Sequence, residues 1–192
     1  VAMLKEAGIK AHYVLIGAGD DVREFPPDFP SDNFNHIVCA VPLKNDTMWL
    51  ECTSQTKAAG YMGSFTGNRN ALLVTDAGGK LVRTPAYKKD DNLFWSKVTA
   101  TLETDGSLRA SLINHYQALC SDDVHARIHH YSKEELQKYL KKNIDLPDYD
   151  LISFDYKEFE GKLPVIKEDL NIIARNYAQF SGKRLFILPN IG

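Results

Sequence analysis

Stretches rich in β-branched and aromatic residues, separated by clusters of Gly, Asn and Asp, run through the first half of the chain and predict strands. They follow residues 1–7, which are interpreted as the end of a helix that Gly8 closes at C′. Lys44-Asn45-Asp46 and Asp76-Ala77-Gly78-Gly79 supply hairpin turns. The strands predicted in this half are 9–16, 33–43, 47–53, 71–75 and 80–84.

Between the first two predicted strands lies a long polar segment, residues 17–32, with two glycines, three prolines and five acidic residues. This composition predicts a loop, and loops of this length are usually lids or disordered segments. The acidic side chains are expected chiefly to keep the loop solvated.

A second pattern begins after a polar stretch near residue 90, and it predicts two parts, 1–88 and 89–192. Ser121 is expected to cap one helix. Ser132 opens a capping box for another helix, and the two helices together occupy residues near 121–144. The strands predicted in this part are 93–102, 107–116, 150–156, 165–175 and 183–188, with Ser181-Gly182 as a turn.

Composition narrows the classes of function. The 192 residues are 44% apolar, which fits one ordinary globular domain or two small ones. Because 23 Lys and Arg face 25 Asp and Glu, no overall field favours nucleic acid, and nucleic acid is not a predicted partner. No apolar run reaches the roughly 20 residues of a membrane span. Three cysteines without a C-x-x-C pair predict neither a zinc framework nor a disulfide scaffold.

His36 and Glu51 are the candidate catalytic residues. They lie on neighbouring predicted strands, where cross-strand partners come within side-chain reach. An even-length turn places His36 on one face with Glu51, whereas an odd-length turn places it opposite Cys52 and directs Glu51 to the other side. A lone strand histidine is more often a hydrogen-bonded core residue, so the hairpin alone favours that ordinary interpretation.

Three segments follow one another in the first half of the chain: Leu4-Lys5-Glu6-Ala7-Gly8-Ile9-Lys10-Ala11, Phe34-Asn35-His36 and Trp49-Leu50-Glu51-Cys52-Thr53. Their order resembles the latter half of a transglutaminase-like domain, the papain-like cysteine fold found in bacterial envelope proteins. In that family a Cys opens a core helix, a His follows on a strand, and an acid, usually Asp in W-x-D-P-T, follows on the next strand. His36 matches the histidine and Glu51 the acid, while Cys52 stands where the family often has proline.

The resemblance implies an α+β fold, with the antiparallel sheet of a truncated transglutaminase-like core over 1–88. A β-rich accessory domain with a small helical insertion follows. It also implies a cysteine peptidase, amidase or acyltransferase acting on polypeptide or peptidoglycan-type amides in the periplasm or cell envelope. The nucleophilic Cys is expected upstream of Val1, so the upstream part of the same protein is a partner and this chain alone is expected to be inactive. The alternative is a non-catalytic module that binds protein or glycan.

His125 and His129 lie four residues apart on a predicted helix, a spacing that puts both on one face. They could bind a metal with a third ligand such as Asp122. Without a nearby Glu or Cys pattern, a solvated helix face is the favoured interpretation. No metal and no cofactor are therefore predicted.

Overall fold

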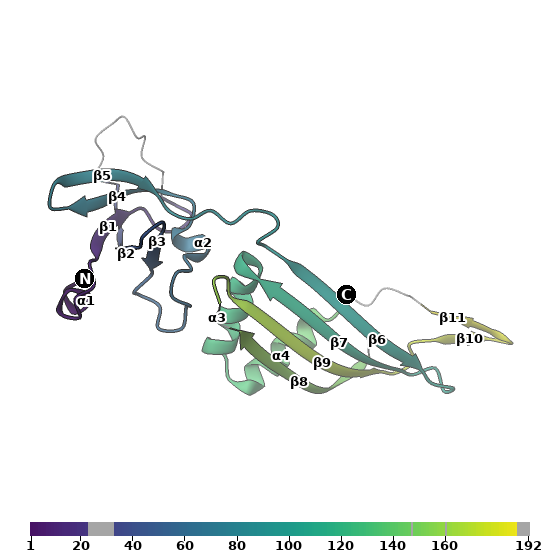
Figure 1. Ribbon diagram of the computed structural model, residues 1–192. Helices are drawn as coiled ribbons and strands as arrows, with labels where there is room; N and C mark the ends of the chain where they lie inside the picture. The colour runs from purple at the N-terminus through teal and green to yellow at the C-terminus, as the bar shows by residue number, and fades with distance from the viewer. Residues whose placement is uncertain (23–32, 147, 160, 188–192) are drawn as a thin grey trace. The chain divides into compact units, whose positions relative to one another are not determined.

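The computed structural model describes residues 1–22, 33–146, 148–159 and 161–187 (Figure 1). Most of the predicted loop 17–32 lies outside the described residues. The chain divides into two compact units, one holding Val1–Asn92 and the other holding Leu93–Phe159 and the strands that follow. The boundary expected at 88–89 thus lies a few residues before the division that the structure has. None of the helices in the described ranges combines the length and apolar character needed to cross a lipid bilayer.

The first unit is built on a five-stranded antiparallel sheet with the strand order β3-β2-β1-β4-β5. Its strands form where the β-branched stretches predict them, but they are shorter at several ends. The central strand begins at His12 rather than residue 9, and the third ends at Leu50 rather than 53. The strands are β1 (His12–Ile16), β2 (His36–Pro42), β3 (Thr47–Leu50), β4 (Asn70–Thr75) and β5 (Gly78–Arg83).

Alternation along these strands sends one set of side chains into a small core. Val14, Ile16 and Val38 are almost completely buried there, and Trp49 and Met62 pack beside them. Burial of such side chains is the main force that holds the strands in register. The core face of β2 is therefore fixed, and with it the direction of every side chain on that strand.

Two short helices flank the sheet: α1 (Ala2–Glu6) and α2 (Gly63–Thr66). Gly8 follows α1 with a φ of +74°, a left-handed conformation that favours glycine. The amide of Gly8 donates to the Lys5 carbonyl and that of Ile9 to the Leu4 carbonyl, which confirms the predicted C-terminal closure of this helix. The sequence does not predict α2, which is a single helical turn.

The second unit has a four-stranded antiparallel sheet with the order β6-β7-β9-β8 and two helices inserted between its hairpins. One face of the sheet forms the core, where Leu112, Leu170 and Ile172 pack against Leu140 from the second helix. A small hairpin, β10 (Gln179–Ser181) with β11 (Arg184–Phe186), follows. The larger elements are β6 (Phe94–Leu102), β7 (Leu108–Gln117), α3 (Asp122–His130), α4 (Lys133–Asn143), β8 (Tyr149–Phe159) and β9 (Val165–Ala174).

The two helix starts differ in how well they match their predictions. The Ser132 hydroxyl accepts from the Glu135 amide at 3.2 Å and the Glu135 carboxylate accepts from the Ser132 amide at 2.8 Å, so the capping box is confirmed. Ser121 stands at the N-cap position of α3 as predicted, but its side chain makes no capping hydrogen bond. A 3₁₀ turn, Ala118–Ser121, precedes α3, and the Ser121 hydroxyl donates back to the Ala118 carbonyl at 2.6 Å. The fold is α+β with antiparallel sheets, as predicted.

Candidate functional site

The first residue of β2, His36, lies at the edge of the core of the first unit. It pairs with Ile16 of β1 and shares its face of the sheet with Val38 and Ala40, which are 1% and 2% exposed. The imidazole itself is 14% exposed. The strand thus holds the ring in place while one part of it stays within reach of solvent.

The register of β2 with β3 decides which residue faces His36. Cys39 pairs with Leu50 and Pro42 with Thr47, so four residues, 43–46, form the turn, and the even-length alternative holds. Glu51 follows β3 directly, and both of its carboxylate oxygens lie 3.0 Å from His36 Nε2. The alternative in which His36 faces Cys52 is excluded. The predicted contact between His36 and Glu51 is therefore confirmed, while a catalytic role stays a prediction.

The Glu51 carboxylate is 3% exposed and is held by several donors besides His36. The amide and hydroxyl of Thr53 donate to Oε1 at 3.2 and 2.7 Å, and the Thr66 hydroxyl lies 3.2 Å from Oε2. Burial alone would raise the pKa of Glu51, but the hydrogen bonds from Thr53 and His36 and the charge of His36 outweigh it. The pKa of this carboxyl is therefore held below its usual value. The Glu51 carboxylate is therefore negatively charged and held in one orientation.

This anion determines which nitrogen of His36 is available for chemistry. Because Nε2 faces the carboxylate, the neutral ring is stabilised with its proton on Nε2 and a lone pair on Nδ1. Among the residues that the structure describes, no hydrogen bond is recorded at Nδ1. The ring of Phe65 packs edge-on against the imidazole, with centroids 5.5 Å apart, and limits its rotation. The pair can thus present Nδ1 as a proton acceptor.

Asn35, the residue before His36, fixes the start of the neighbouring loop. Its side-chain oxygen accepts from the Ala18 amide at 2.7 Å, and its side-chain nitrogen donates to the Ala18 carbonyl at 3.0 Å. The Gly19 amide then donates to the Phe65 carbonyl at 3.0 Å. Asn35, Phe65 and Thr66 therefore support the His36–Glu51 pair. Sequence reasoning assigned no role to them, because their partners lie 15 or more positions away.

The cysteines of this unit do not face His36. Cys39 pairs with Leu50, one position out of phase with His36, and therefore projects from the opposite face of the sheet. Burial raises the pKa of the Cys39 thiol, which keeps it protonated and unreactive. Cys52 is exposed, and its thiol lies 3.6 Å from the Leu50 carbonyl. Neither thiol is part of a disulfide.

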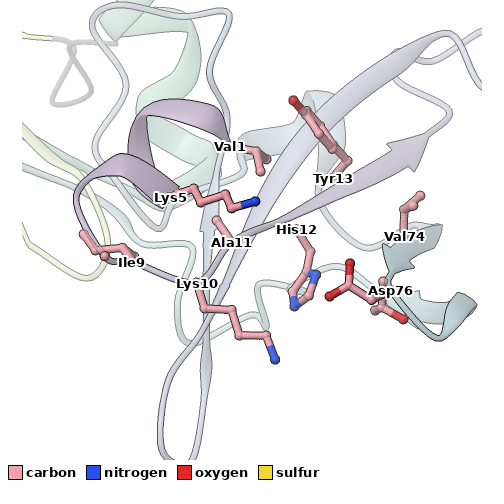
Figure 2. Close-up of a pocket in the computed structure, with 11 residues that line it drawn as sticks. Val1, Lys5, Ile9, Lys10, Ala11, His12, Tyr13, Val74 and Asp76 are labelled. Atoms are coloured by element: carbon pink, nitrogen blue, oxygen red, sulfur yellow. The ribbon is translucent and has the colours of Figure 1, made fainter.

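A cavity of about 520 Å³ opens at the other end of β1 (Figure 2). His12 and Asp76 point toward one another there, and Lys5 and Lys10 contribute two cationic side chains. His12 pairs with Ala40 and lies four positions along β1 from Ile16, the partner of His36. The cavity is thus separate from the His36–Glu51 pair.

The second unit contains a buried carboxylate that the sequence did not single out. Glu168 of β9 is 5% exposed and accepts from Asn114 at 2.6 Å, from Tyr156 at 2.6 Å and from Tyr116 at 3.2 Å. Asn114 and Tyr156 are its direct cross-strand neighbours on β7 and β8. Among the described residues, these donors satisfy the hydrogen-bonding capacity of the carboxylate, as a buried polar group requires.

Glu168 also lines a cavity of about 330 Å³ between the sheet and the helices of the second unit. Arg127 of α3 contributes to the same lining, and its guanidinium stacks 4.5 Å above the ring of Tyr139. This stacking holds the guanidinium over the Tyr139 ring in the cavity that Glu168 also lines. Arg127 and Glu168 thus give a polar part to a cavity that apolar side chains such as Leu112 also line.

No family model matches this chain, and neither a curated protein nor a solved structure does.

Proposed function

We propose that this chain supplies the base and the orienting acid of a transglutaminase-like cysteine hydrolase or acyltransferase. His36 is the base and Glu51 is the acid that orients it. The observation that carries the proposal is the contact of His36 Nε2 with both oxygens of Glu51 at 3.0 Å, with the carboxylate almost completely buried. An acid fixed in this way sets the tautomer of an imidazole base.

The chemistry proposed is acyl transfer through a thioester. Nδ1 of His36 takes the proton of a thiol, and the thiolate adds to the carbonyl carbon of an amide. The C–N bond then breaks as the imidazolium returns the proton to the leaving amine. Water or a second amine resolves the thioester in the same manner, with His36 again as the base.

Glu51 contributes to each of these steps through its charge. Because its pKa is held below the usual value, the carboxyl stays ionised at neutral pH. An anion at Nε2 stabilises the imidazolium that forms when Nδ1 takes a proton. Glu in place of the family's usual Asp adds one methylene, and the position of Glu51 just beyond the end of β3 accommodates it.

The proposal takes the thiol from polypeptide that precedes Val1, because Cys39 lies on the opposite face and Cys52 is directed away from the pair. The substrate proposed is an amide of the polypeptide or peptidoglycan type, and the location proposed is the bacterial periplasm or envelope. Both rest on the resemblance of the segments around His36 and Glu51 to the transglutaminase-like family.

The test is alkylation of that thiol in a longer polypeptide that contains this chain. Serine replaces Cys39, Cys52 and Cys120, so that only the preceding thiol reacts with iodoacetamide. We expect His36→Ala to slow alkylation at neutral pH by at least about tenfold, because the thiolate loses its base. His12→Ala removes an imidazole at the far end of β1 and should leave the rate unchanged.

Equal rates for wild type and His36→Ala would contradict the proposal. That result would favour the alternative, a binding module that retains the fold without catalysis. The alkylation rate of Glu51→Gln is a second test, because this substitution keeps the side-chain shape and removes the charge. An intermediate loss of rate is expected if the acid acts through His36.

A further inference from the structure

Three side chains of the kinds that bind metals converge in the second unit, far along the sequence from His36. His125 and His129 lie one turn apart on α3, and their ring centroids are 4.4 Å apart. Glu158 of β8 reaches both rings. Its two oxygens lie 3.0 and 3.1 Å from His129 Nε2, and Oε1 lies 3.9 Å from His125 Nε2. A helix and a strand thus bring two imidazoles and one carboxylate together.

We propose that this cluster binds a divalent metal, Zn²⁺, with His125, His129 and Glu158 as its protein ligands. The ligand atoms all lie within 4.8 Å of one another. In a tetrahedral site with bonds of about 2.0–2.1 Å, ligand atoms are roughly 3.4 Å apart. The distances from Glu158 Oε1 to the two imidazoles, 3.0 and 3.9 Å, lie on either side of that value. Small side-chain rotations suffice to bind the ion.

The chemistry of the ligands selects zinc over the common alkaline-earth ions. Two imidazole nitrogens and one carboxylate oxygen suit Zn²⁺. Mg²⁺ and Ca²⁺ prefer sites made of oxygen ligands. With three protein ligands, the fourth position of a tetrahedral Zn²⁺ is open to a water molecule.

The cluster is accessible to an ion from solution and is still held in place. The side chains of His125, His129 and Glu158 are 18%, 32% and 37% exposed. Val124, beside His125 on α3, is 2% exposed and anchors the helix, while β8 is paired along its length with β9. The bound metal would therefore connect α3 to β8 and stabilise the second unit.

The carboxylate in this cluster differs from the one that the spacing suggested. The third ligand suggested from the sequence is Asp122, but the carboxylate that meets both imidazoles is Glu158, 29 positions from His129. That separation is why the sequence favoured a solvated helix face. The inference does not depend on the His36–Glu51 pair, and either one can fail alone.

Isothermal titration of the chain with ZnCl₂, after treatment with EDTA and its removal, tests the proposal. We expect one ion per chain. His125→Ala, His129→Ala and Glu158→Gln should each weaken binding by at least about tenfold, a loss that even outer-shell changes commonly cause. His130→Ala removes a neighbouring exposed histidine outside the cluster, and Cys52→Ser removes an exposed thiol. Both should bind as wild type does, and MgCl₂ should give no saturable binding.

Co²⁺ provides a second readout that does not depend on heat. The wild-type chain should develop the visible absorption of cobalt bound by nitrogen and oxygen ligands in a tetrahedral site, and Glu158→Gln should lose it. Absence of saturable Zn²⁺ binding to the wild type would overturn the proposal. Retention of wild-type affinity by the His125→Ala/His129→Ala double variant, with its circular dichroism unchanged, would also overturn it and leave an ordinary His–Glu ion pair.

Discussion

The imidazole of His36 and the carboxylate of Glu51 meet at 3.0 Å through Nε2 and both acid oxygens, although 15 positions separate the two residues. The four-residue turn between β2 and β3 makes this contact possible, because it sets the register in which both side chains share the core face. Thr53 and Thr66 then fix the acid from its other sides. The contact is therefore a property of the hairpin and its surroundings rather than of two mobile surface groups.

Glu51→Gln should make the first unit less stable at neutral pH and less sensitive to acid. The amide loses hydrogen bonds to a charged acceptor, which costs about 1–3 kcal/mol of the free energy of unfolding. Because the pKa of Glu51 is lowered in the folded state, its contribution is present above its usual value of 4.5 and is lost as the pH falls below it. Glu51→Gln should therefore lose less free energy of unfolding than the wild type over the same fall in pH.

Urea denaturation followed by tryptophan fluorescence measures this difference. The chain has two tryptophans, Trp49 in the core of the first unit and Trp95 in the second unit, so a Trp95→Phe background lets Trp49 report alone. If the free energy of unfolding fell equally in wild type and Glu51→Gln between pH 6 and pH 3, the result would contradict a lowered pKa of Glu51 in the folded state.

Asn35→Ala should release the backbone of Ala18 without unfolding the sheet. The side chain makes two hydrogen bonds to Ala18, and the loss of one such bond costs about 1 kcal/mol. We expect amide hydrogen exchange at Ala18 to accelerate by roughly five- to thirtyfold, for the loss of one or of both bonds. Asn45→Ala, in the turn between β2 and β3, serves as a control that should leave Ala18 protected. Unchanged exchange at Ala18 in Asn35→Ala would mean that other contacts hold this segment.

Tyr156→Phe should destabilise the second unit by about 1–3 kcal/mol, because it removes a donor to the buried Glu168 carboxylate. Burial, together with the charge of Glu168, raises the pKa of Tyr156 far above its usual value. The folded phenol therefore stays neutral. Its stabilising contribution is complete below the usual value of 10.0 and is lost as the pH rises beyond it.

Denaturation in a Trp49→Phe background, with Trp95 as reporter, measures the effect of Tyr156→Phe. Tyr131→Phe is the matched control, because its ring is 44% exposed and lies outside the Glu168 cluster. Alkaline titration at 295 nm adds an independent test. Wild type and Tyr156→Phe should give the same absorbance change up to about pH 11 when folded, and they should differ only in urea.

Much of the fold was predictable because its signals are local. The hairpin turns predicted at 44–46 and 76–79 and the capping box at Ser132 are short patterns with a direct physical cause. The structure has these turns at 43–46 and 76–77. The contact of His36 with Glu51 was predictable as one of two alternatives, since turn parity decides it. Whether the turn between β2 and β3 has an even or an odd number of residues could be learned only from the structure, because the sequence does not fix the strand ends to a single residue.

The remaining features depend on residues that are distant in sequence. Glu168 meets Asn114 and Tyr156 only because β9 lies between β7 and β8. Glu158 reaches His129 only because β8 lies near α3. Ser121 stands at the predicted N-cap position of α3, but its hydroxyl donates to the Ala118 carbonyl and does not cap the helix. These outcomes follow from tertiary packing, which no local pattern contains.

The tautomer of His36 provides the most direct test of the central claim that Glu51 holds the ring with Nδ1 as the proton acceptor. Long-range ¹H–¹⁵N correlation spectra of the chain, recorded where the ring is neutral, distinguish the two nitrogens. We expect Nε2 to carry the proton in the wild type and the preference to weaken in Glu51→Gln. A proton on Nδ1 in the wild type, or identical spectra for the two proteins, would contradict the account.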